Sequence, residues 1–201
     1  MISSRMALGA LVLLAGGVGG LGAQATGTTT FNAPYRAFTR SEFGILLSFP
    51  SGGGTAFEGA YRMASGRFDI GFKGGLLDPD GPDDAVLLVG AEARQRVLTH
   101  TTDFPLDGAL ILGAGGNFGS GHSRLIIPVG LSLGRRLDTE TNVSIVPYVQ
   151  PTMLVTVNRG SDVLFALGLG VDFRLSRVFD ARLSAGLGDV EGVSIGAVWV
   201  H

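Results

Sequence analysis

The stretch VLFALGLGVDFRL, residues 163–175, alternates between two kinds of side chain. Its odd-numbered positions are all large and apolar, whereas its even-numbered positions pass from Leu and Ala through Gly to Asp172 and Arg174. Because successive side chains of a β-strand point to opposite faces, this stretch predicts a strand with one apolar face and one face of small or charged residues. A lipid bilayer outside and a crowded barrel lumen inside suit these two faces.

The same alternation recurs along most of the chain after residue 41. It is less regular in residues 84–98 and 106–118, and Ile126 interrupts it in residues 122–136. Residues that favour turns, mainly Gly, Pro, Asn, Asp and Ser, separate the apolar runs. Strands are predicted at 42–49, 55–64, 67–77, 84–98, 106–118, 122–136, 141–157, 162–176, 178–188 and 191–200. This gives ten strands, or eight if the first hairpin lies outside the sheet.

Strand length distinguishes a membrane barrel from most soluble sheets. Soluble strands usually have about 5–6 residues, whereas a tilted strand that crosses a bilayer needs about 9–11. Most of the predicted strands are that long, and no later segment has the apolar length of a membrane-spanning helix. Unpaired backbone groups are costly in hydrocarbon, so the sheet must close. The predicted fold class is an all-β, closed antiparallel transmembrane β-barrel of about ten strands, in which Pro128, Pro147 and Pro151 are expected at bulges or rims.

Composition favours the membrane over water. Charged residues make up 16% of the 201 residues, against about 25% in ordinary soluble domains, and Lys73 is the only lysine. A soluble exterior would carry many Lys and Glu residues. The alternative is a soluble periplasmic, lipocalin-like barrel that turns its apolar face inward and binds an apolar ligand. The net charge of -2 gives no indication of a nucleic-acid partner, and the absence of cysteine excludes thiol catalysis.

The N-terminus predicts export. Arg5 precedes an apolar core at residues 6–14, and small residues follow up to Ala23-Gln24-Ala25, which matches a signal-peptidase pattern. Residues 1–25 are therefore expected to be a signal peptide, cleaved between Ala25 and Thr26. Residues 26–41 are then a polar N-terminal extension, and residues 42–201 form the barrel in the bacterial outer membrane.

Residues 42–201 resemble the small outer-membrane β-barrel proteins of Gram-negative bacteria, the OmpA-like or OmpX-like superfamily. The closing stretch VSIGAVWVH, residues 193–201, is similar to the C-terminal insertion signal of that family, with an aromatic residue at Trp199. The family usually ends in Phe, whereas this chain ends in His201. The resemblance implies contact with outer-membrane lipid and lipopolysaccharide, recognition of the C-terminal strand by the barrel-insertion machinery, and periplasmic termini.

Charged side chains on the inward face form the main candidate site. Both signs are present, and arginine pairs well with carboxylates in partly desolvated surroundings. Two interpretations remain open: a structural ion-pair network that fills a narrow barrel, which is favoured, or a polar pathway for small solutes or ions. Strand parity places in the lumen Glu58, Arg62, Asp69, Lys73, Glu92, Arg94, Arg96, Asp172, Arg174, Asp180 and Arg182.

A catalytic site is not predicted. His122 and Ser123 lie near Asn117, but adjacent residues on a strand point to opposite faces and cannot form a nucleophile–base pair. His100 lies near Asp103, and the three histidines have no metal-site spacing, so no cofactor or metal is expected. The chain is therefore expected to be a structural or narrow-pore barrel without enzymatic activity, and a lipid-modifying barrel enzyme is the least favoured alternative.

Overall fold

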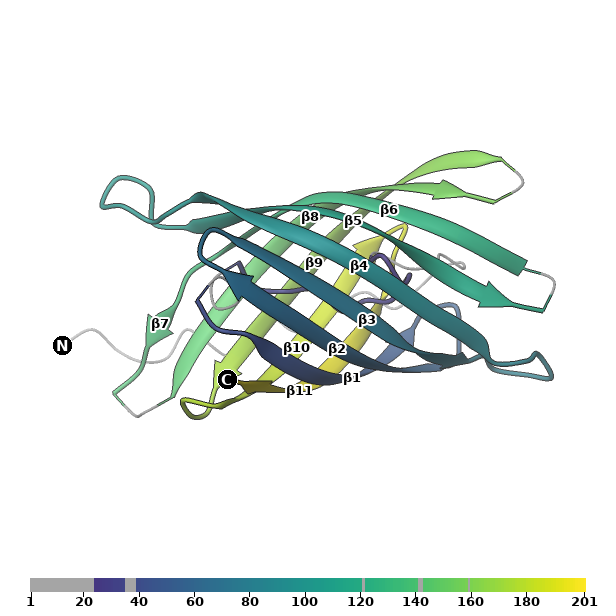
Figure 1. Ribbon diagram of the computed structural model, residues 1–201, viewed down its shortest axis with the longest axis horizontal. Coiled ribbons are helices and arrows are strands. Elements are labelled where there is room, and N and C mark those ends of the chain that lie inside the picture. The colour runs from purple at the N-terminus through teal and green to yellow at the C-terminus, as the bar shows by residue number, and fades with distance from the viewer. Residues whose placement is uncertain (1–23, 35–38, 121, 141–142, 159) are drawn as a thin grey trace, which may run out of the picture.

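Ten long antiparallel strands and one very short strand make up the protein in a computed structural model, which describes residues 24–34, 39–120, 122–140, 143–158 and 160–201 (Figure 1). Most of the predicted signal peptide, residues 1–23, lies outside the described residues. No helix in the described ranges is long and apolar enough to cross a membrane. The strands are β1 Glu42–Pro50, β2 Thr55–Ser65, β3 Phe68–Asp78, β4 Val86–Leu98, β5 Asp107–Gly119, β6 His122–Gly134, β7 Leu137–Asp138, β8 Ser144–Val157, β9 Ser161–Arg174, β10 Phe179–Gly188 and β11 Gly192–Val200.

The sheet closes on itself. Each long strand pairs with the long strands before and after it in the chain, and the first strand pairs with the last. The two-residue β7 does not separate β6 from β8, which pair directly. In this seam Glu42 lies opposite Val200, and Pro50 lies opposite Gly192. The predicted all-β closed barrel of ten long strands is confirmed, the first hairpin belongs to it, and every predicted strand end lies within three residues of the observed one.

The barrel is apolar outside and polar inside, the reverse of a soluble protein. In residues 163–175, Phe165 is 63% exposed and Val163 is 56% exposed, whereas Asp172 is 1% exposed. Ile126, which interrupts the sequence alternation, faces inward and packs in a lumenal apolar cluster with Leu154 and Phe31. An outer wall of exposed Leu, Val, Ile and Phe around buried charges is the arrangement of a membrane-spanning barrel.

The prolines lie at weak points of the hydrogen-bonded ladder. The β5–β6 pairing is interrupted between the pairs Leu112↔Val129 and Gly115↔Ile126. Pro128 lies in this gap, where no backbone N–H has to donate to β5. Pro151 lies in a similar interruption of β6–β8 pairing. Pro147 lies close to the end of β8, beyond the last β6–β8 pair, and its carbonyl accepts a hydrogen bond from the backbone N–H of Arg135. Proline in a sheet therefore coincides with local loss of pairing, as its missing N–H requires.

The two ends of the barrel carry opposite charge. We call the end where β1 begins and β11 ends the mouth, and the other end the far end. The mouth carries seven arginines and four carboxylates on its turns and strand ends: Arg40, Arg67, Arg96, Arg135, Arg136, Arg174 and Arg177, with Asp103, Asp107, Asp138 and Glu140. The far end carries Asp78, Asp80, Asp83, Asp84, Asp162, Asp189 and Glu191. The net charge of -2 thus combines an excess of positive charge at the mouth with an excess of negative charge at the far end.

Candidate functional site

The barrel lumen is filled by the chain's own residues 24–34, which we call the lumen segment. All eleven of its residues are buried, including Thr26 and Phe31, neither of which has exposed surface. From Pro34, which lies beside Gly134 near the mouth, it runs toward Thr28, which contacts Glu58 nearer the far end. A turn at Gly27, with a φ of 81°, then directs residues 24–26 back along the wall. Most of the polar extension predicted from Thr26 onward is therefore part of the barrel interior.

Asn32 ties the lumen segment to the wall on several sides. Its side-chain NH₂ donates to Glu92 on β4 at 3.2 Å, and its side-chain oxygen accepts from Arg182 on β10 at 2.8 Å. Its backbone N–H donates to Gln150 on β8 at 3.3 Å, and its carbonyl accepts from Ser132 on β6 at 2.7 Å. One residue thus bridges four strands across the lumen with all of its polar groups, which is how a buried polar side chain avoids a desolvation penalty.

Glycines in the wall make room for the segment. A Cβ on Gly168 would overlap the ring of Phe31, and a Cβ on Gly90 would lie 2.8 Å from the Cβ of Ala25. The Tyr148 ring occupies the space that Gly170 leaves, and its hydroxyl donates to the Phe31 carbonyl at 2.9 Å. The inward-facing small residues noted in the sequence therefore accommodate this segment and the larger lumenal side chains.

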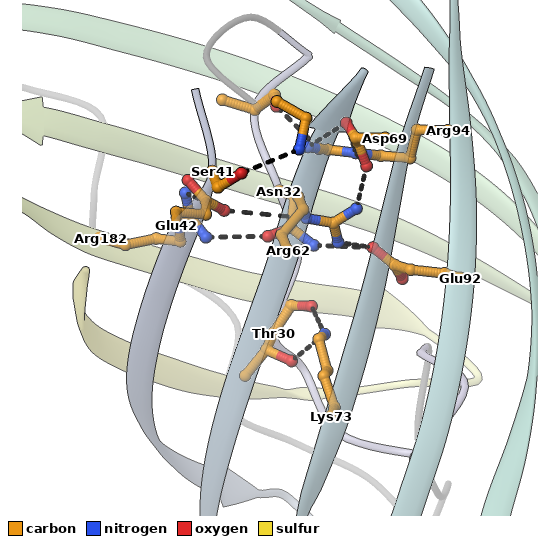
Figure 2. A network of polar contacts seen from close by, with 12 residues as sticks. Thr30, Asn32, Ser41, Glu42, Arg62, Asp69, Lys73, Glu92, Arg94 and Arg182 are labelled. Atoms are coloured by element: carbon orange, nitrogen blue, oxygen red, sulfur yellow. Dashed lines mark hydrogen bonds and ion pairs between the residues drawn. The ribbon is translucent and has the colours of Figure 1, made fainter. Parts of the chain in front are cut away.

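Seven charged side chains form an ion-pair layer on the mouth side of the lumen, and Figure 2 shows all of them except Asp172. Arg62 is at its centre and contacts both Asp69 and Glu92, with Glu42 at 3.7 Å. All of these side chains are buried, so each charge depends on its neighbours for solvation. The layer consists of Glu42, Arg62, Asp69, Glu92, Arg94, Asp172 and Arg182.

Two further arginines anchor the edges of the ion-pair layer. Arg94 donates from Nε to both carboxylate oxygens of Asp69, at 3.0 and 3.1 Å, and from Nη1 to the Ala33 carbonyl at 2.9 Å. Arg182 forms a two-point contact with Asp172, at 2.9 and 3.0 Å. Such bidentate geometry is the strongest form of a guanidinium–carboxylate contact. The layer therefore holds the wall strands to one another and to the lumen segment.

Lys73 and Glu58 continue the polar contacts toward the far end. The ammonium of Lys73 donates to Gln24 at 3.1 Å and to the hydroxyl and carbonyl oxygens of Thr30 at 2.8 and 3.1 Å. Glu58 accepts from the Thr28 hydroxyl at 2.7 Å. Both charges face hydroxyl and carbonyl groups of the lumen segment. Its threonines therefore solvate wall charges as water would.

The predicted lumen residues occupy nearly the positions that parity gave them. Ten of the eleven are buried inside the barrel, and Arg96 is partly exposed at the mouth. The structure brings most of them into two connected groups, one around Arg62 and one around Arg182, joined by Asn32 and Glu42. Glu42 and the lumen segment were missed. The alternation in residues 42–49 could have revealed Glu42, whereas residues 24–34 have no period that indicates a lumenal path.

The histidine contacts in the described residues differ from those that the sequence suggested. His100 pairs with Asp107, its Nδ1 lying 2.9 Å from the carboxylate, rather than with Asp103 nearby in sequence. The His122 side chain lies outside the described part of the structure, so the His122–Ser123 alternative is not placed. Over the described ranges, no group of three or more His, Cys, Asp or Glu side chains could hold a metal ion.

No protein-family model matches this chain, and comparison with curated proteins finds no similar sequence. This chain is similar at low identity to a number of solved structures, three of which follow. A structure titled "De novo design of transmembrane beta-barrels" is 13% identical, with 85% of this chain and 98% of that chain covered and a TM-score of 0.43. The β domain of the Bordetella autotransporter BrkA is 14% identical, with coverages of 81% and 97% and a TM-score of 0.43. A bacterial polysaccharide outer-membrane secretin is 14% identical, with coverages of 74% and 57% and a TM-score of 0.46.

Replacing Gly168 by alanine is expected to disturb the lumen segment. The added methyl group would overlap the Phe31 ring, and overpacking of this kind typically costs about 1–3 kcal/mol of folding free energy. The control is Gly52→Ala, because nothing lies within 4 Å of a Cβ at Gly52. Denaturant unfolding in detergent micelles measures both. Adding Phe31→Ala to Gly168→Ala should remove most of the steric penalty, and a penalty independent of Phe31 would contradict the packing described here.

Proposed function

We propose that this protein is a small outer-membrane β-barrel of Gram-negative bacteria, of the OmpA-like or OmpX-like kind, with a structural role and a closed lumen in its resting state. The observation that carries the proposal is the lumen segment, tied by Asn32 to strands on several sides of the barrel. It favours a structural barrel over the porin-like, narrow-pore form that the inward charges also suggested.

The lumen is expected to stay closed because displacing the lumen segment would cost free energy. For ions to pass, water must replace the lumen segment next to Lys73, Glu58 and the ion-pair layer. That exchange would break hydrogen bonds between the segment and buried charges, each of which stabilises more than a bond between neutral groups. The apolar contact of Phe31 with Ile126, Val146 and Leu154 opposes the same movement. A segment held in both ways is a stable plug.

Conductance across a planar lipid bilayer tests this function. The full chain, inserted from detergent, is expected to give no stable open state at moderate voltage, because its lumen is filled. Heat-denatured protein serves as the baseline. Steady, repeatable single-channel steps from the full chain would overturn the proposal of a closed barrel and would support the narrow pore instead.

The outer surface supports a membrane location and its lipid partners. Large apolar side chains cover it, and Trp199 on the closing strand packs against Phe43 and Phe179 at ring-centroid distances of 6.4 and 5.4 Å. Aromatic residues near a barrel end suit the lipid–water interface. We infer that lipid and lipopolysaccharide contact this wall, and that β11 is the segment read by the insertion machinery. His201 is anchored there by its N–H to the Ser41 carbonyl and by stacking on Tyr61.

A heat-dependent gel shift tests the membrane assignment. Protein extracted from the outer-membrane fraction is expected to migrate differently in SDS before and after boiling, since a closed ladder leaves no edge for the detergent to attack. Recovery from the soluble periplasm without a shift would favour the lipocalin-like alternative. That alternative needs an apolar interior, whereas the described wall turns its ion pairs inward.

We further propose that the protein is not an enzyme, is exported by a signal peptide cleaved between Ala25 and Thr26, and needs no cofactor. Cleavage there would remove Gln24 and Ala25 from the lumen but leave the contacts of Thr28, Thr30, Phe31 and Asn32 in place. The proposed plug therefore does not depend on the two residues that processing would remove.

A further inference from the structure

The mouth of the barrel contains two overlapping cavities lined by arginine. The larger, of about 620 Å³, is lined by four arginines together with Ser144, Leu175 and Ser176. The smaller, of about 440 Å³, shares three of those arginines and adds Arg96, His100 and Asp107. We call the five arginines the arginine mouth: Arg40, Arg96, Arg136, Arg174 and Arg177.

Five separate parts of the chain bring these side chains together. Arg40 precedes β1, Arg96 lies in β4, Arg136 follows β6, Arg174 ends β9, and Arg177 lies in the turn before β10. They meet because all five positions lie at the same end of the antiparallel barrel. The five arginines are far apart in the sequence and become neighbours only in the folded barrel. No single stretch of sequence therefore shows the cluster.

Two carboxylates contact the residues that line the cavities. Among the described residues, Asp107 is the only carboxylate that lines either cavity, and it accepts a hydrogen bond from the backbone N–H of His100 at 3.1 Å and lies 2.9 Å from the His100 Nδ1. Arg136 donates from Nε to Asp138 at 2.6 Å. Hydrogen bonds from Ser144 and Arg136 hold the pKa of the Asp138 carboxyl below its usual value. Among the described residues that line the two cavities there are five guanidinium groups and one carboxylate.

We propose that the arginine mouth binds an anion that carries phosphate groups. Guanidinium groups form planar, bidentate hydrogen bonds with phosphate oxygens, and several of them around one cavity stabilise a multiply charged ligand. Arg40 is held in place by donation from its Nη1 to the Arg177 carbonyl at 2.9 Å, so part of the site is preorganised. The inference concerns the mouth alone and holds whether or not the lumen conducts ions.

The phosphate group has two plausible sources. Exposed Leu175 lines the larger cavity, and exposed Val178 follows in the same turn, which would let a phospholipid place its head group among the arginines and its chains on the apolar wall. A soluble phosphorylated compound would use the same arginines without these apolar contacts. The shared chemistry is the phosphate group, and two binding measurements separate the sources.

The first measurement is calorimetric titration of pyrophosphate into the full chain in a nonionic detergent at physiological ionic strength. The double variant Arg136→Gln/Arg177→Gln changes two exposed arginines that line the cavity. Charge-assisted hydrogen bonds are strong enough that we expect affinity to fall by about tenfold or more for the pair. The control is Arg135→Gln. Arg135 is exposed and next to Arg136 but lines neither cavity. Loss of this surface charge should leave the affinity for pyrophosphate within about twofold of the wild-type value.

The second measurement is retention of phosphatidylglycerol against phosphatidylcholine by the full chain in native mass spectrometry. Pyrophosphate binding or selective phosphatidylglycerol retention that is lost in Arg136→Gln/Arg177→Gln supports the site, and the ligand retained identifies the source. Unheated gel mobility checks that each variant is folded. The proposal is overturned if the wild type binds neither probe, or if Arg135→Gln weakens binding as much as the cavity variant, since attraction would then reflect surface charge alone.

Discussion

Deletion of residues 27–34, which leaves the proposed cleavage site between Ala25 and Thr26 intact, is expected to produce a stable ion conductance in planar bilayers. The deleted residues are all buried inside the wall, and their contacts with Lys73, Glu58 and the ion-pair layer are mostly hydrogen bonds that water can replace. Water entering the vacated volume would surround wall charges of both signs. Single-channel recording of the folded, heat-modifiable deletion variant against the full chain measures the effect. A deletion variant that is folded and still silent would contradict the assignment of this segment as the plug.

A disulfide lock provides the control, because the chain has no cysteine of its own. The Thr29 and Ser194 hydroxyl oxygens lie 2.8 Å apart inside the barrel, which places these side chains close enough for a Thr29→Cys/Ser194→Cys bond. Oxidation should form this bond quantitatively, and the locked full chain should remain non-conducting at any voltage. Free thiols after oxidation of the folded double variant would show that the segment does not lie against β11.

Replacement of Arg62 by methionine is expected to cause the largest loss of stability of any single change in the lumen. Methionine keeps much of the side-chain length but removes the charge that Asp69, Glu92 and Glu42 share. Breaking a buried ion pair by removing one partner typically costs about 3–5 kcal/mol, because the remaining charges lose their compensation. The free energy of unfolding in detergent micelles, from denaturant titration, measures the effect.

Arg67→Met is the matched control for this variant. Arg67 is exposed in the turn between β2 and β3, and the same substitution there should change the free energy of unfolding by no more than about 0.5 kcal/mol. Equal effects at Arg62 and Arg67 would mean that the ion-pair layer contributes little to stability. A further comparison is Arg62→Met with Glu92→Gln, which removes a charge of each sign and should recover part of the loss.

The barrel could be predicted from the sequence because alternation and strand length are local properties. A strand such as residues 163–175 shows both of its faces in a single stretch, and turn residues mark where each strand ends. The same parity placed Arg62, Asp69 and Arg182 on the inner face. Which carboxylate each arginine contacts depends on register between strands and on side-chain reach, and neither is encoded in a single strand.

The lumen segment could not be predicted because its signal is not periodic. Residues 26–34, TGTTTFNAP, are small, uncharged and mostly polar, a composition that suits an exposed linker as well as a buried filler. Whether these residues lie inside the barrel depends on the width of the lumen and on the space left by the glycines at 90, 168 and 186. That space exists only once the barrel has closed. The arginine mouth was missed for a similar reason, since its members come from five separate parts of the chain.

The seam between β1 and β11 has a consequence for assembly. Residues 24–34 precede β1, so they emerge before any strand of the wall, yet they end up enclosed by all of them. Passing a polar segment sideways through a finished wall would be very costly, so the segment enters either while the wall is still open or through the mouth, where Pro34 lies beside Gly134. Joining of the first and last strands would close the sideways route and leave the barrel ends as its ways in and out.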